Sequence, residues 1–74
     1  MSRLPDVRPR ELVAALKKAG FTEHHQKGSH LYLWHAQRRC MTSVPMHPGD
    51  IHRGLLPAII KQAGLSRDEF LRLL

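Results

Sequence analysis

The residues best placed to do chemistry lie around His30, one of six histidines in a chain of 74 residues. Lys27, Gly28 and Ser29 come directly before it and together offer a cation, an approachable backbone and a hydroxyl group, all of which suit a phosphate. Histidine has a reference pKa of about 6.5, so both protonation states are available near neutral pH. We therefore predict that Lys27, Gly28 and Ser29 bind phosphate, which makes His30 a candidate for proton transfer. The alternative is that His30 is an ordinary exposed histidine on a strand.

Three kinds of side chain admit a second interpretation. His47 is a further candidate for acid–base chemistry and for phosphate binding, although a role in stabilising its own loop is favoured. Cys40 could be a nucleophile, but its place in an alternating strand pattern favours a small core residue. Tyr32 and Trp34 could stack on bases, whereas packing under a helix is the commoner use of a strand tryptophan.

The histidines do not form a recognisable metal-binding pattern. Structural zinc sites use closely paired cysteines and histidines at defined offsets. This chain has one cysteine, and its histidine pairs are adjacent or five residues apart: His24, His25, His30, His35, His47 and His52. We expect neither a metal ion nor a cofactor.

Short elements have to position these residues. Apolar residues recur at helical spacing from Pro9, a favoured first helical residue, to Ala19, and Gly20 supplies a left-handed stop. A short and mostly solvated strand is expected in residues 21–27, followed by a turn at the Gly28-Ser29 pair. The clearest strand spans residues 30–35, where leucines alternate with histidine, tyrosine and tryptophan.

The second half of the sequence predicts one more strand and two helices. The strand runs from Cys40 to Val44, where Pro45 stops further pairing, and residues 45–50 form a loop. A helix beginning near Arg53 or Gly54 carries Pro57 in its first turn and ends at Gly64. The residues Ser66-Arg67-Asp68-Glu69 then match a capping box that opens a short last helix.

This order predicts an α+β fold, with helices packed on one face of a three-stranded antiparallel sheet. The α-β-β-β-α arrangement with a short C-terminal helix is also the topology of double-stranded-RNA-binding domains. A chain of 74 residues has room for one domain, which we expect to span residues 1–74.

The charge balance favours a polyanionic partner, because 12 Lys and Arg against 6 Asp and Glu leave a formal charge of +6. Basic residues recur from Arg3 to Arg72, so the charge belongs to the folded domain; a merely soluble basic surface is the alternative. The single cysteine and the absence of a signal-peptide pattern predict a cytoplasmic protein, and no segment is apolar enough to span a membrane.

Four segments together resemble the HicA toxins of bacterial and archaeal toxin–antitoxin systems. The family's opening helix is matched by residues 16–21, its central Gly-Ser-His motif by residues 27–30, its proline–histidine loop by residues 44–47 and its closing helix by residues 60–65. The sequence departs from the family pattern at Lys27, where arginine is frequent. It departs again at Leu55 and Pro57, which replace a helix start containing threonine.

The resemblance implies a fold like that of double-stranded-RNA-binding domains, an endoribonuclease that cleaves mRNA, and inhibition by a HicB-type antitoxin. His30 falls on the family's catalytic histidine. RNA cleavage without a metal needs a base for the ribose 2′-OH, relief of charge at the phosphate and an acid for the leaving 5′-oxygen. The competing interpretations are a non-catalytic RNA-binding module of the same fold and a structural adaptor for another protein.

Overall fold

A computed structural model describes residues 4–74 of the chain, so Arg3, the first of the basic residues, lies outside the described part. Helix and strand order follows the sequence prediction. The elements are α1 (Pro9–Lys18), β1 (Thr22–Lys27), β2 (His30–His35), β3 (Cys40–Pro45), α2 (Leu55–Gln62) and α3 (Arg67–Leu73). The predicted α+β fold, with the α-β-β-β-α arrangement and a short last helix, is confirmed.

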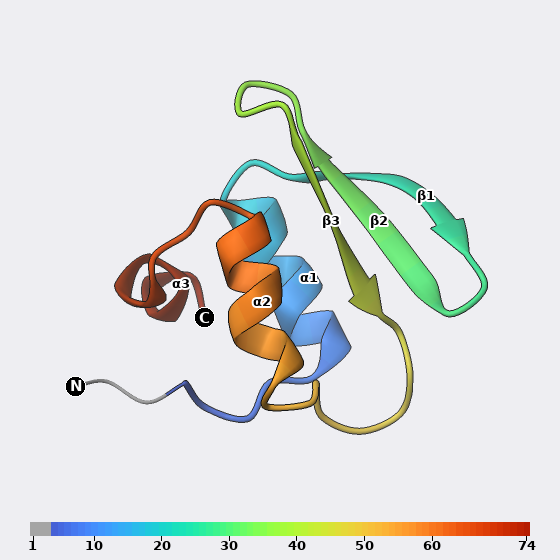
Figure 1. Ribbon diagram of the computed structural model, residues 1–74, viewed down its shortest axis with the longest axis vertical. Coiled ribbons are helices and arrows are strands. Elements are labelled where there is room, and N and C mark those ends of the chain that lie inside the picture. The colour runs from blue at the N-terminus through green and yellow to red at the C-terminus, as the bar shows by residue number, and fades with distance from the viewer. Residues whose placement is uncertain (1–3) are drawn as a thin grey trace.

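The three strands form one antiparallel sheet in the order β1-β2-β3. The helices gather on one side of this sheet, and α3 contacts both α1 and α2 (Figure 1). Strand β2 is central and pairs with β3 over its whole length, from His30 opposite Pro45 to His35 opposite Cys40. Its pairing with β1 is interrupted by a bulge between Glu23 and His25.

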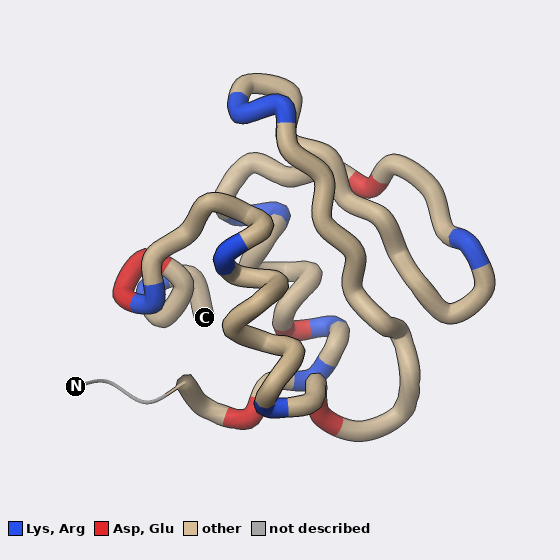
Figure 2. The backbone as a smooth tube through the Cα atoms, viewed as in Figure 1, with Lys and Arg blue, Asp and Glu red and all other residues tan. Residues whose placement is uncertain are grey.

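Lysine and arginine are distributed around the whole backbone and do not collect at one end of it (Figure 2). The positive charge therefore belongs to the folded domain, as predicted. No helix in residues 4–74 is long and apolar enough to cross a membrane.

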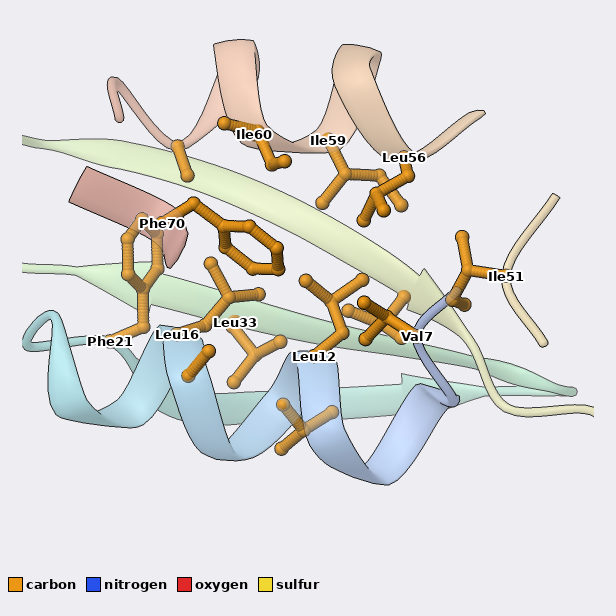
Figure 3. Close-up of a cluster of buried hydrophobic side chains, with 14 of the residues drawn as sticks. Val7, Leu12, Leu16, Phe21, Leu33, Ile51, Leu56, Ile59, Ile60 and Phe70 are labelled. Atoms are coloured by element: carbon orange, nitrogen blue, oxygen red, sulfur yellow. The ribbon is translucent and has the colours of Figure 1, made fainter. Parts of the chain in front are cut away.

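The hydrophobic core fills the space between the helices and one face of the sheet (Figure 3). Leu12 and Leu16 of α1 and Leu33 of β2 are fully buried there. Phe21 and Phe70, two of the four aromatic residues of the chain, pack into the same cluster. Because β2 places every second side chain in this core, its other face points away from the helices.

Local signals at the ends of the helices act as the sequence predicts. Gly20 follows α1 with a φ of 108°, a left-handed conformation that favours glycine. Gly54 is the N-cap of α2, which places Pro57 within the first turn of that helix. Ser66 caps α3: its hydroxyl accepts a hydrogen bond from the Glu69 N–H at 3.1 Å, and the Glu69 carboxylate accepts one from the Ser66 N–H at 3.0 Å.

One expectation is wrong. Trp34 does not pack under a helix, because it alternates with the buried residues Leu33 and His35 and so lies on the face of the sheet away from the helices. Strand β1 is exposed along its entire length, which confirms the prediction of a solvated strand. Cys40 is half-buried against the core, in agreement with the role favoured for it.

The Ser66 cap generates a stability prediction. Ser66→Ala removes the acceptor for the Glu69 N–H and should lower the free energy of unfolding by about 1 kcal/mol, or about 4–8 °C in Tm. Ser66→Asp restores a capping acceptor and should recover most of this loss. Thermal unfolding followed by circular dichroism measures both variants, and equal stabilities of Ser66→Ala and the wild type would contradict the cap.

The same cap makes stability depend on pH. Hydrogen bonds from the backbone N–H and then the side chain of Ser66 lower the pKa of Glu69 below its usual value of 4.5. A carboxyl group whose pKa is lower in the folded chain stabilises that chain fully above its unfolded pKa, and the stabilisation is lost as pH falls through the folded pKa. The stability difference between wild type and Glu69→Gln should therefore be largest near neutral pH and vanish in acid.

Candidate active site

The predicted phosphate-binding residues form the tight turn between β1 and β2. Lys27 and His30 are paired across the turn, which leaves Gly28 and Ser29 as its two central residues. Gly28 has a φ of 60°, and a positive φ at the first central position is what a type II′ hairpin turn requires. The Gln26 side-chain amide donates to the Gly28 carbonyl at 3.2 Å and steadies the turn.

His30 begins the central strand and is exposed. It is flanked by Lys27 of β1 on one side and by Pro45 of β3 on the other. Since it alternates with the buried Leu31, its side chain belongs to the face of the sheet that the helices leave uncovered. This placement agrees with the alternation of residues 30–35 in the sequence.

The fold joins the glycine turn to the proline–histidine loop, two segments that are separate in the sequence. The N–H of Met46 donates to the carbonyl oxygen of Ser29 at 2.6 Å, directly beside the pairing of His30 with Pro45. His47 follows one residue later. All five predicted site residues therefore lie at the same end of the sheet.

His47 is exposed, and its ring Nδ1 lies 3.0 Å from the Pro48 carbonyl oxygen. A carbonyl oxygen only accepts, so Nδ1 carries the hydrogen and, in the neutral ring, Nε2 is left as an acceptor. The contact agrees with a loop-stabilising role and still leaves one ring nitrogen for proton transfer.

A shallow hollow of about 330 Å³ adjoins His47. The start of α1 supplies Arg8, Pro9 and Arg10 to its lining, and the loop from Met46 to Gly49 supplies the rest. The carboxylate of Glu11 accepts a hydrogen bond from the Arg8 N–H at 3.1 Å. Sequence reasoning did not connect the two arginines with His47, because about forty residues separate them along the chain and only the tertiary fold brings them together.

His35 has a different environment from His30, although it lies on the same strand. It is buried at 7% exposure, and the ring meets Phe21 edge-on with centroids 5.1 Å apart. Its Nδ1 accepts from the N–H of Arg38 at 3.1 Å, so the hydrogen of the neutral ring sits on Nε2, which donates to the carbonyl of Ala19 at 3.1 Å. His35 thus connects the end of α1 to the loop after β2.

Gly20 fits closely against this histidine. A Cβ atom at position 20 would lie 2.7 Å from Nε2 of His35, so glycine is required both by the contact and by its positive φ. The structural role of His35 was missed in the sequence, yet a signal existed: position 35 continues the alternation of Leu31 and Leu33 and therefore faces inward.

The other histidines are His24 and His25, whose ring centroids lie 4.9 Å apart, and His52. His24 and His25 lie on β1, and His52 accepts a hydrogen bond from the Gly54 N–H at 3.0 Å at the start of α2. Within residues 4–74 no three His, Cys, Asp or Glu side chains come together as a metal site.

The fold and the site define a small basic α+β protein with the arrangement of a double-stranded-RNA-binding domain and an exposed histidine beside a glycine turn. A sequence model of the family described as HicA toxin of bacterial toxin–antitoxin systems matches residues 9–65. The chain belongs to the HicA toxin family. No individual curated protein matches the chain.

The contrast between His35 and His30 yields a paired prediction. His35→Ala leaves the Ala19 carbonyl and the Arg38 N–H without their partner and opens a cavity, so it should cost about 2–4 kcal/mol of stability. His30→Ala removes an exposed ring and should change stability by no more than about 0.5 kcal/mol. Urea unfolding followed by circular dichroism compares the two variants, and similar losses in both would contradict the assignment.

Proposed function

We propose that this HicA toxin is an endoribonuclease that cleaves mRNA without a metal and uses His30 as its general base or acid. One observation carries the proposal: His30 is exposed at the start of the central strand, next to a glycine turn that is hydrogen-bonded to the His47 loop. We further propose that residues 1–74 act as a single cytoplasmic domain.

In the proposed reaction the ribose 2′-oxygen attacks the neighbouring phosphorus and the bond from phosphorus to the 5′-oxygen breaks. A base takes the proton of the 2′-hydroxyl, and an acid gives one to the leaving 5′-oxygen. The products are a 2′,3′-cyclic phosphate and a 5′-hydroxyl, so atoms and charge balance without an added reactant. His30 carries out one of these two proton transfers, as the base or as the acid.

Charge on the pentacoordinate phosphate also has to be stabilised. Lys27 is an exposed cation opposite His30, and the backbone at Gly28 is open to an approaching phosphate, since a Cβ atom there would have nothing within 4 Å. We assign phosphate binding to these three residues. His47 is the candidate for the second proton transfer through its Nε2, and loop stabilisation is its alternative role.

Substitution of His30 tests the proposal directly. His30→Ala should reduce RNA cleavage by a factor of about 10² to 10⁴, the usual contribution of a general acid or base, and should relieve growth inhibition. His24→Ala, which removes an exposed histidine from the same hairpin, is the matched control and should keep full activity. A folded His30→Ala protein that cleaves RNA at the wild-type rate would refute the assignment.

The proposed chemistry also predicts the products and the response to chelation. Cleavage should continue in EDTA and leave a 2′,3′-cyclic phosphate, because the 2′-oxygen and not a metal-bound water attacks phosphorus. Mass spectrometry of a short cleaved oligonucleotide identifies the ends. Activity that is lost in EDTA and restored by a divalent ion, or products with a 5′-phosphate, would refute this mechanism.

A non-catalytic RNA-binding module is the second candidate function, favoured by the fold and by the formal charge of +6. Both candidates require an affinity for RNA that falls with salt, with a log–log slope of about −0.7 for each phosphate contacted on a single strand. The two functions differ in whether purified protein degrades the RNA that it binds.

We also propose that a HicB-type antitoxin inhibits the chain by covering His30. The support is the family membership, the exposure of His30 and a net charge that offers an acidic protein electrostatically steered association. Co-expression with the antitoxin should give an inactive complex in which His30 is protected from diethyl pyrocarbonate. If the complex is inactive and His30 reacts as in the free chain, direct covering is wrong.

A further inference from the structure

The sheet has one face without helices, which we call the open face. By register it includes three residues from each strand, and all of them except the buried Pro45 are exposed or half-buried: Thr22, His25 and Lys27 of β1, His30, Tyr32 and Trp34 of β2, and Met41, Ser43 and Pro45 of β3. Within residues 4–74 the helices pack on the opposite face, against Leu31, Leu33 and Val44. The open face therefore shares strand β2 with the candidate active site.

Aromatic rings lie next to His30 on this face. The ring of Tyr32 stacks on that of His25, with centroids 4.5 Å apart and planes 9° from parallel. Trp34 follows on the same strand, opposite Met41, whose side chain is 39% exposed. Tyr32 and Trp34 are half-buried, so each side chain keeps a solvent-accessible surface.

The electrostatics of the open face suit a polyanion. Glu23 is the only acidic residue in the three strands, and it is opposite Leu33, whose side chain points to the helices. Its carboxylate pairs with Lys17 of α1, so that negative charge is held on the helix side of the sheet. Lys27 and His30 remain at one end of the open face, next to the rings.

These features distinguish single-stranded RNA from a duplex. Bases in a duplex are stacked on one another and present only their edges, whereas bases of a single strand can lie on aromatic side chains. Alternate residues on a strand are about 7 Å apart, so His30, Tyr32 and Trp34 form a row that an extended chain of nucleotides can follow. A duplex would meet phosphate-binding groups here but would leave the rings unused.

We propose that the open face is a substrate-binding platform on which bases of single-stranded RNA stack, one on Tyr32 with His25 and the next on Trp34, while the adjoining phosphate lies at Lys27 and His30. The inference rests on the proposed ribonuclease function for its ligand. Beyond that function, the inference specifies which residues bind the bases and that the bound RNA is single-stranded.

Trp34 is the only tryptophan of the chain, so its fluorescence reports on this face. The full chain with His30→Ala, which should bind RNA without cutting it, is titrated with a single-stranded oligonucleotide of about eight nucleotides. Stacked bases should quench Trp34. A sugar–phosphate strand of equal length without bases should bind more weakly and leave the fluorescence unchanged, and a duplex of the same sequence should do likewise.

Substitutions test each ring by the affinity for labelled RNA. Tyr32→Ser and Trp34→Ser should each weaken binding by about tenfold or more, whereas Tyr32→Phe and Trp34→Phe should stay near wild type. Leu74→Ser removes an exposed apolar side chain at the C-terminus and is the matched control, expected to change nothing. Melting curves verify that each variant is folded, and the fluorescence titration leaves both rings, Tyr32 and Trp34, unsubstituted.

Three results would overturn the platform: equal quenching by the strand without bases, tighter binding of the duplex with Trp34 fluorescence unchanged, or loss of antitoxin binding in Tyr32→Ser with RNA affinity intact. The last would assign the face to a protein. Failure of the proposed function is a separate result. In that case wild-type protein does not cleave RNA, whether or not the bases stack.

Discussion

The side-chain alternation of strand β2 is the constraint on which the rest of the structure depends. Leu31, Leu33 and His35 enter the core, and the residues between them form the middle of the open face. Because the period of a strand is two, a shift of one residue in its pairing would exchange the two sets. His30 would then enter the core and Leu33 would face water. Stability and the candidate active site therefore require the same register, and neither can be kept without the other.

Contacts at both ends of β2 hold this register. At the end of the strand, His35 accepts a hydrogen bond from Arg38 and donates one to Ala19, and Gly20 fits against the ring where a Cβ atom would collide with it. At the beginning, the Ser29 carbonyl accepts from the Met46 N–H, which ties the turn to the loop after β3. The buried His35 thus helps to position the exposed His30. His35 fixes β2 against α1, and β2 in turn places His30 beside the glycine turn.

The sequence predicts what depends on local chemistry and misses what depends on distant contacts. The glycine stop after α1, the capping box of α3 and the leucine alternation of β2 are local, and each is found as expected. Packing under a helix is the commoner role of a strand tryptophan and was favoured for Trp34, although the alternation itself places it on the other face from Leu33. Arg8 and Arg10 beside His47 could not be foreseen, since the path of the loop after β3 decides which end of α1 it meets. The position of His30 was predictable for the opposite reason, because one turn and one strand determine it.

The helices of residues 4–74 cover only one face of the sheet, and this arrangement bears on the proposed chemistry. The helices and core residues are used to bury Leu33 and its neighbours, so a catalytic group on the other face lies in water. Electrostatic stabilisation of a transition state is weaker in water than in a site from which water is excluded. Bases lying over Tyr32 and Trp34 would exclude water from the part of the face that adjoins His30. Binding energy from these bases would also hold the reacting phosphate against the turn at Gly28, which is how contacts remote from the broken bond contribute to rate. In the proposed arrangement the RNA would complete a site that the helices and the core do not enclose.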